Sequence, residues 1–222
     1  QKQAALLFVH LSDADRRSIG QHLLEQALEQ NPQDVVLRLQ QAALLIQENN
    51  TVSFEEASMI LTRLIKELPR LEEAWYTLGE LSLIEHKPAQ AMDYALTGLY
   101  YLPDSRSLLL LKAQAESVRS PISAISTLKI LLQDHPADKN VILMLSQNYR
   151  EIDRYNQALE LLERSLSQES LRGSEDLRRE KMIILYEIGQ IDKAKALYRE
   201  MISGSSDGRI LLTWLELLSR DE

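Results

Sequence analysis

Apolar and small residues recur along the chain at intervals of three and four positions, which is the spacing of one face of an α-helix. The same arrangement returns six times: a small residue begins the face, and an aliphatic residue lies eight positions later in every case. The small residues are Gly20, Ala57, Ala91, Ala124, Ala158 and Ala194. The aliphatic residues are Leu28, Ile65, Leu99, Leu132, Leu166 and Ile202. This pattern predicts a helix in each of the six segments.

A break in the helical pattern follows twelve positions after each small residue. In the first four segments the break is a proline, which cannot continue a helix because it has no N–H group and its ring clashes with the preceding turn. The six break positions are Pro32, Pro69, Pro103, Pro136, Ser170 and Ser206. The arrangement therefore repeats with a period of about 34 residues, which indicates a repeat architecture.

Between each break and the next small residue there is room for a second helix. Four such stretches are apolar on one side and bounded by turn residues, which predicts helices at 35–48, 72–85, 105–118 and 138–151. The predicted unit is therefore a pair of helices joined by one short turn and followed by another.

Polar residues at the starts of three of these four helices support the boundaries. Asp34, Asp138 and either Asp104 or Ser105 can accept hydrogen bonds from N–H groups that have no partner within the first helical turn. We therefore expect each of these side chains to cap its helix.

The starts of the other helices carry different signals. Pro88 and Pro121 fit the first turn of a helix, where the missing N–H group has no cost. Ser53 followed by Glu56 has the spacing of a capping box, so we expect the helix that carries Ala57 to begin near Ser53.

One helical pair carries a specific combination of residues. Its first helix contains Trp75, Leu78 and Gly79, its second helix opens with Ala91, and Pro103 closes it. A pair of this length with these residues resembles the tetratricopeptide repeat. A second good copy comprises Leu145, Ser146, Tyr149, Ala158, Leu162 and Ser165. The resemblance covers nearly the whole chain.

The resemblance implies an all-α fold, a right-handed superhelical solenoid of helix-turn-helix repeats. No single pair of helices buries its apolar face alone, so stacked pairs form one continuous core. We expect a single array over residues 1–222. Its repeats are at about 1–34, 35–71, 72–104, 105–138, 139–172 and 173–208, followed by a cap helix at 209–222 whose apolar side contains Ile210, Leu211, Trp214, Leu215 and Leu218.

Three departures from the repeat pattern are visible. About three extra residues lie around Glu48–Ser53, where the helices of the second repeat join, and about two more lengthen the loop near Leu171–Glu175. Arg178 and Lys181 occupy positions where the pattern has apolar groups. We therefore expect the first helix of the sixth repeat to be shifted or loosely packed.

The composition removes several classes of function. The formal net charge is −8 and no basic block is present, which argues against nucleic acid as a partner, including RNA. The chain has no cysteine, and its four histidines, His10, His22, His86 and His135, fall in different repeats without metal-ligand spacing. No glycine-rich phosphate loop or nucleophile motif is present. We expect no catalytic residues, no metal and no cofactor, and no uncharged run is long enough to span a bilayer.

The densest positive stretch contains Arg172, Arg178, Arg179 and Lys181. Acidic residues are interleaved with it, namely Glu175, Asp176 and Glu180, which favours ion pairs on a solvated helix face. A site for phosphate or an acidic peptide is the alternative interpretation. Near the end of a second helix, Tyr101 is expected in the repeat core with Tyr100 shielding it.

The resemblance also implies where a ligand binds, because the first helices of this family line a concave groove. Residues one step away from the packing positions point into that groove. On this chain they are Leu39, Ala43, Ile46, Tyr76, Glu80, Leu83, Leu109, Ala113, Glu116, Leu143, Gln147 and Arg150.

An apolar seam of four of these residues would suit an extended segment or an amphipathic helix with apolar anchors. The seam comprises Leu39, Tyr76, Leu109 and Leu143. The alternative is that these side chains only pack between adjacent first helices. Members of the family that bind chaperone tails hold a carboxylate with Lys and Asn at such positions, and the Leu, Ala, Tyr and Glu found here disfavour that function.

Two functions follow from this pattern. The first is a non-catalytic scaffold that binds a peptide or helix of a partner protein. The second is a regulatory or assembly segment of a larger enzyme or cell-envelope complex, suggested because the chain opens at Gln1 without Met and its first repeat begins abruptly, as in an excised piece. The sequence assigns neither compartment nor oligomeric state.

Overall fold

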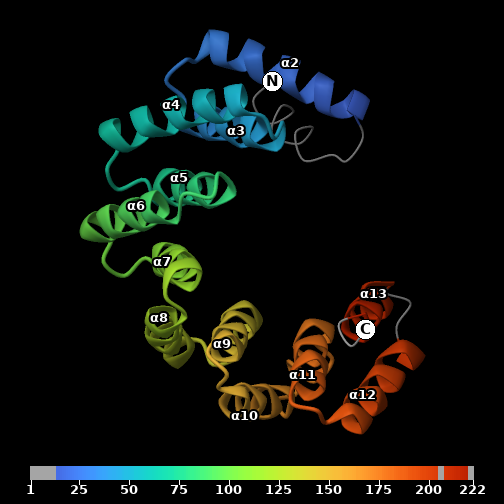
Figure 1. Ribbon diagram of the computed structural model, residues 1–222. Helices are drawn as coiled ribbons and strands as arrows, with labels where there is room; N and C mark the ends of the chain where they lie inside the picture. The colour runs from blue at the N-terminus through green and yellow to red at the C-terminus, as the bar shows by residue number, and fades with distance from the viewer. Residues whose placement is uncertain (1–13, 205–207, 220–222) are drawn as a thin grey trace. The chain divides into compact units, whose positions relative to one another are not determined.

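The computed structural model describes residues 14–204 and 208–219, and every regular element in these residues is an α-helix (Figure 1). The helices of this part of the chain are α2 (Ala14–Gln30), α3 (Val35–Gln47), α4 (Thr51–Glu67), α5 (Glu72–Ile84), α6 (Pro88–Tyr101), α7 (Arg106–Arg119), α8 (Pro121–Asp134), α9 (Lys139–Glu151), α10 (Tyr155–Leu166), α11 (Glu175–Glu187), α12 (Ile191–Gly204) and α13 (Gly208–Leu218). His10 and Ser206 lie outside the described residues. Residues 1–13 of the predicted first repeat and residues 220–222 of the predicted cap helix lie outside them as well.

The helices follow the predicted pattern of pairs. The four stretches predicted as first helices form α3, α5, α7 and α9, and each begins within about one residue of its expected start. The small residue that begins each repeated face lies in the second helix of its pair, from Ala57 in α4 to Ala194 in α12. The predicted all-α architecture of paired helices is therefore confirmed.

The chain divides into two compact units after Ala115, within α7. In the first unit α3 packs on α4 and α5 on α6, and the two first helices α3 and α5 also contact each other. In the second unit α9 packs on α10 and α11 on α12, while α9 contacts α11 and α11 contacts α13. In both units a first helix thus contacts its own partner and the next first helix.

The predicted caps of the first helices are present. The Asp34 carboxylate accepts hydrogen bonds from the N–H groups of Val36 and Leu37 at 3.0 and 3.2 Å, and Asp138 caps α9 in the same way. At the start of α7 the hydroxyl of Ser105 accepts from the N–H of Leu108 at 3.1 Å. Pro88 and Pro121 are the first residues of α6 and α8, as predicted. These local contacts set where the helices begin.

The predicted capping box at Ser53 and Glu56 is wrong. The cap of α4 is Asn50, whose side-chain oxygen accepts from the N–H of Ser53 at 3.0 Å, and the helix begins at Thr51. Ser53 is buried instead, and its hydroxyl donates to Glu48. The extra residues of this repeat therefore add a turn to α4, which has 17 residues against 14 in α6 and α8.

The predicted lengthening of one loop is confirmed. Residues 167–174 join α10 to α11, whereas residues 68–71 join α4 to α5 and residues 135–138 join α8 to α9. Leu171 lies in this longer loop and is buried, so its side chain holds the loop against the rest of the second unit.

The small residues at the start of each repeated face allow close packing of helix on helix. Their methyl groups are completely buried at Ala57, Ala91, Ala124, Ala158 and Ala194. Larger aliphatic side chains on the same helices, such as Leu61, Leu128 and Leu162, fill the space beside them and are also fully buried. The core of each unit is built from this alternation.

Aromatic residues close one side of the core in the first unit. Trp75 donates its indole N–H to the carbonyl of Pro69 at 2.9 Å, and the ring of Tyr101 stacks on it with centroids 6.1 Å apart. Tyr100 meets the edge of Tyr101 at 5.2 Å and keeps 81% of its surface exposed. The predicted position of Tyr100 on the outer side agrees with the structure, whereas Tyr101 is not a core residue, because it stacks on Trp75 but keeps 37% of its surface exposed.

The face predicted for the C-terminal helix is only partly correct. Ile210, Trp214 and Leu217 of α13 are buried, and Trp214 stacks on Tyr198 at 4.9 Å and meets the edge of Tyr186 at 5.8 Å. The other three leucines of the expected face, Leu211, Leu215 and Leu218, are exposed. The helix has two apolar faces, and only one of them lies against α11 and α12.

We expect Gly98→Ala to destabilise the first unit. A β-carbon there would lie 2.7 Å from Cδ1 of Leu108 and 3.1 Å from Cβ of Trp75, which is too close for both neighbours. The clash should outweigh the gain in helix propensity and leave a net loss of about 1 kcal/mol, measured as a lower midpoint of urea denaturation. Gly173→Ala is the control, because no atom lies within 4 Å of its β-carbon. An unchanged midpoint for Gly98→Ala would contradict the close packing.

Candidate functional site: a hollow on the first helices

The predicted groove residues differ in how much of their surface is accessible. Most are half-buried: Leu39, Ala43, Tyr76, Glu80, Leu109, Leu143 and Arg150. Gln147 is exposed. Ala113 is completely buried, so its methyl group is not available to a ligand in this structure.

In the first unit several of these positions line one hollow of about 450 Å³ on the first helices, called the α3–α5 hollow below. Its lining residues are Ala43, Ile46, Gln47, Thr77, Glu80, Leu81, Leu83, Ile84 and Gln114. They come from α3, α5 and the first part of α7. The sequence analysis named Ala43, Ile46, Glu80 and Leu83, and it missed the other five lining residues, namely Gln47, Thr77, Leu81, Ile84 and Gln114.

Side chains of the predicted seam in the first unit pack on the core and also remain partly exposed. Leu39 and Tyr76 of the seam pack against the core of the first unit, as do the groove residues Ile46 and Leu83, and all four keep part of their surface exposed. The two interpretations of the sequence are therefore compatible here. Packing between first helices holds these side chains in place, and what remains exposed is an apolar surface with a fixed shape.

The hollow carries one formal charge, which is negative. Burial and a hydrogen bond with the Glu80 carboxylate raise the pKa of the Tyr76 hydroxyl well above its ordinary value. No Lys or Arg among the described residues forms an ion pair with Glu80. The side-chain oxygen of Gln114 is buried and accepts no hydrogen bond from the described residues. The hollow thus offers a carboxylate that has no cationic partner among the described residues and one amide oxygen that has no donor.

In the second unit the predicted groove residue Arg150 is held by two carboxylates. Its Nε donates to Glu180 and its Nη1 to Glu187, each at 3.0 Å. Only 4% of the Glu180 side chain is exposed. Burial raises the pKa of Glu180, although Arg150 acts in the opposite direction. Arg150 therefore links α9 to α11 instead of facing the solvent freely.

The sequence analysis placed Glu180 on a solvated helix face. The structure corrects this, because Glu180 is buried. Glu180 and Glu187 are seven residues apart, so they lie on the same side of α11. That spacing, with an arginine about one repeat earlier, is a signal that could have found the cluster.

The equivalent place in the first unit shows why the hollow is there. Counted from the start of its helix, Ile46 corresponds to Arg150, while Thr77 and Ile84 correspond to Glu180 and Glu187. All three corresponding residues line the α3–α5 hollow. Where the second unit has a long arginine between two carboxylates, the first unit has shorter, uncharged side chains.

The basic run in the second unit is paired as expected of a solvated face. Arg178 binds Glu200 at 3.1 Å and Arg179 binds Asp176 at 3.1 Å. Lys181 binds Glu163 on α10 at 2.9 Å. Pairing of this kind explains how α11 carries Arg178 and Lys181 at positions where the repeat has apolar residues.

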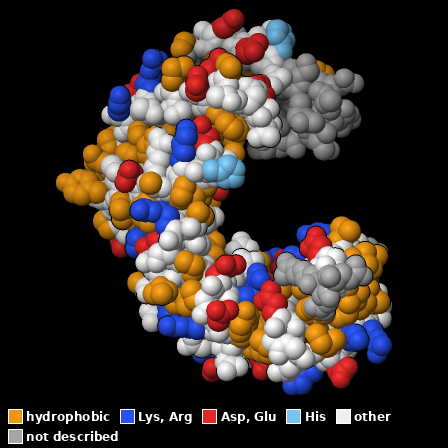
Figure 2. All heavy atoms as spheres, in the orientation of Figure 1, with side chains coloured by type: hydrophobic (Ala, Val, Ile, Leu, Met, Phe, Trp, Pro, Cys, Tyr) orange, Lys and Arg blue, Asp and Glu red, His pale blue; other side chains and the backbone are white. Residues whose placement is uncertain are grey.

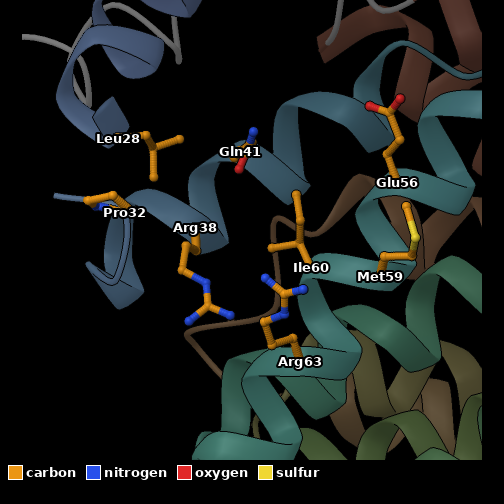
Figure 3. A pocket seen from close by; sticks show the side chains of 8 residues that line it. All are labelled: Leu28, Pro32, Arg38, Gln41, Glu56, Met59, Ile60 and Arg63. Atoms are coloured by element: carbon orange, nitrogen blue, oxygen red, sulfur yellow. The ribbon is translucent and has the colours of Figure 1, made fainter. Parts of the chain in front are cut away.

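A second hollow of about 440 Å³ lies between α2, α3 and α4 in the first unit, called the α2–α4 hollow below (Figure 3). It is lined by Leu28, Pro32, Arg38, Gln41, Glu56, Met59, Ile60 and Arg63. The guanidinium groups of Arg38 and Arg63 face it from the same side of the view. Arg38 is buried and donates to Glu67 at 2.6 Å, which lowers the pKa of Glu67. Its charge is therefore already compensated.

Exposed apolar side chains also occur away from the hollows. Figure 2 shows them over α6, where Leu96 and Tyr100 are exposed, and around α13, where Leu211 and Leu212 are exposed. Nothing in the structure identifies what covers these faces. Among the described residues, no cluster of acidic and histidine side chains could hold a metal ion. None of the described helices combines the length and apolar character of a membrane span.

No family model matches the sequence, and no curated protein is significantly similar to it. Solved structures do match. The type IV pilus biogenesis factor PilW aligns with a TM-score of 0.78 at 17% identity, covering 96% of each chain. A tetratricopeptide repeat protein from Parabacteroides merdae aligns with a TM-score of 0.70 at 13% identity over 96% of this chain and 85% of its own. YrrB, a TPR protein with an unusual peptide-binding site, aligns at 0.59 and 16% identity over 87% and 97%.

These likenesses, with the paired helices and the buried small residues, define the class of the fold. The chain has the fold of the tetratricopeptide repeat proteins, as its sequence motifs predict.

We expect Arg150→Met to destabilise the second unit by about 3 kcal/mol, because it leaves the buried Glu180 carboxylate without a cation. Arg178→Met is the matched control, since its partner Glu200 is mostly exposed and the pair contributes at most about 1 kcal/mol. Midpoints of urea denaturation compare the two variants. Equal effects would show that burial of Glu180 does not matter.

The raised pKa of Glu180 gives a pH dependence with a definite sign. A carboxyl group whose pKa is higher in the folded state contributes stability that is fully present below its unfolded pKa, and this contribution is lost as the pH rises through the folded pKa. The stability of the wild type relative to Glu180→Gln should therefore fall as the pH rises above 4.5, the ordinary pKa of this group. Urea denaturation of both proteins at several pH values measures this, and a relative stability that rises over this range would contradict it.

Proposed function

We propose that this chain is a non-catalytic scaffold that holds an amphipathic segment of a partner protein against the α3–α5 hollow. The observation that carries the proposal is the hollow itself. Its aliphatic side chains are fixed by the core beneath them, it has room for apolar groups of a ligand, and a few polar atoms lie beside them. This combination is typical of sites that bind a peptide through apolar anchors.

The residues that bind are those of the hollow together with the seam beside it. Leu39, Tyr76 and Leu109 supply the seam in the first unit, and Leu143 has the corresponding position in the second. Gln147 and Arg150 lie near Leu143 on α9, although Arg150 is largely used by its carboxylates. The description of YrrB as a protein with an unusual peptide-binding site supports binding of a peptide by a solenoid of this fold.

The other surfaces are less suited to this function. The α2–α4 hollow has a similar volume, but its buried Arg38 is already bound to Glu67, and its exposed charges are of both signs. A ligand there would have to compete with an existing ion pair. The basic run on α11 is likewise paired with neighbouring carboxylates.

A second candidate is an assembly role within a larger complex of the cell envelope. The observation that favours it is the alignment with PilW, a type IV pilus biogenesis factor, over 96% of both chains. Cross-linking mass spectrometry of the protein in its own cells would distinguish the two functions. Cross-links to several subunits of one assembly would favour this role, and cross-links from α3 and α5 to a single segment would favour the scaffold.

The groove can be tested without a known partner. A random peptide display library is selected on the wild-type protein, and synthetic copies of enriched peptides are measured by fluorescence polarisation. Ile84→Asn removes an exposed aliphatic wall of the hollow and should weaken binding at least about tenfold, because the contact area of one aliphatic side chain is lost.

The matched control is Met59→Asn on α4, which removes an exposed apolar side chain from the α2–α4 hollow instead. It should leave peptide binding unchanged. Circular dichroism confirms that both variants are folded. If both variants bind the peptides as the wild type does, the hollow is not the binding site; if the library yields no binder, the scaffold proposal is wrong.

A further inference from the structure

The polar groups of the α3–α5 hollow are unbalanced toward acceptors. The Thr77 hydroxyl donates its hydrogen to the carbonyl of Glu73 at 2.7 Å, and the Tyr76 hydroxyl is used by Glu80. The amide groups of Gln47 and Gln114 can both donate and accept, so the groups left without a counterpart are the carboxylate of Glu80 and the buried side-chain oxygen of Gln114, which has no donor among the described residues. The lining contains no Lys, Arg or His. An occupant of this hollow therefore has to bring donors.

We propose that the α3–α5 hollow selects amphipathic segments in which a Lys or Arg lies next to an aliphatic anchor. This inference rests on the proposed function and adds the chemistry of the partner. The aliphatic side chain contacts Ile46, Leu83 and Ile84, while the cation pairs with Glu80. An N–H group of the segment or of its basic side chain donates to Gln114.

The second unit contains the same chemistry within the chain. There the side chain of Arg150 runs between α9 and α11 and donates to two carboxylates, while its aliphatic stem is largely buried. In the first unit the corresponding residue is Ile46, which brings no charge. A basic side chain from a partner would supply what Arg150 supplies in the second unit, with Glu80 as its carboxylate.

Segments of other composition fit less well. An acidic residue beside the anchor would place a second negative charge near Glu80, and like charges at short distance repel. A wholly apolar segment would cover the Glu80 carboxylate without giving it a cation, and burial of an uncompensated charge costs free energy. A basic residue avoids both penalties, so charge complementarity sets the preference.

The test uses a display library with a fixed central leucine and Lys, Gln or Glu allowed at the flanking positions. Selection on the wild type should enrich Lys over Glu at one or more flanking positions. Three synthetic peptides with Lys, Gln or Glu at the enriched position are then measured by fluorescence polarisation. The Lys peptide should bind about three- to tenfold more tightly than the Gln peptide, and added salt should reduce this difference.

Glu80→Gln should remove the preference for Lys while binding of the Gln peptide stays as in the wild type. Glu73→Gln is the matched control, because it removes one charge from the same helix at an exposed position outside the hollow. It should keep the preference.

The outcomes separate the two proposals. Peptides that need Ile84 for binding but show no preference for Lys, or keep that preference in Glu80→Gln, overturn this inference and leave the scaffold intact. Failure to enrich any peptide, or binding that does not depend on Ile84, overturns both.

Discussion

The close approach of two helices at a small residue is the contact on which the rest of the structure depends. At Ala57, Ala91 and Ala158 the methyl group is completely buried, so the second helix of a pair lies directly on the first. Larger side chains such as Leu61 and Leu162 then fill the space between neighbouring pairs. Within the units α3 also contacts α5 and α9 contacts α11, and part of the apolar surface of α3 and α5 stays exposed at the edge of the core. The α3–α5 hollow is a consequence of this packing and needs no additional element.

Features set by contacts within a few residues of the chain were predictable. Asp34 and Pro88 act at the ends of their helices as expected, because capping and proline chemistry depend only on the adjacent turn. The prediction at Ser53 is wrong since Asn50 offers a competing cap three residues earlier, and a pattern does not decide between two local solutions. The buried face of α13 was predicted only in part for another reason: its sequence is apolar on two sides, and the neighbouring helices decide which side is buried.

The candidate site could be predicted to the level of helix faces. The resemblance to the repeat family placed Ile46, Glu80 and Leu83 in the groove, and all three residues line the hollow on α3 and α5. It gave no indication of Gln114, whose buried oxygen becomes notable only when its neighbours are known to lack a donor for it. It also placed Arg150 at the groove but did not predict its ion pairs with Glu180 and Glu187. Ion pairs between residues about one repeat apart depend on how the helices pack together and not on local periodicity.

Corresponding positions in the two units have opposite uses. In the second unit Arg150, Glu180 and Glu187 satisfy one another, and the cost of burying these charges is offset only because each has its partner. In the first unit the corresponding residues carry no charge, so the same place stays open, and Glu80 nearby has no basic partner among the described residues. A repeat in which each charged side chain has a partner within the chain leaves few polar groups available to bind a ligand. A repeat whose pairing is incomplete exposes an apolar hollow with an unbalanced carboxylate, and this imbalance gives a site the means to distinguish one amphipathic segment from another.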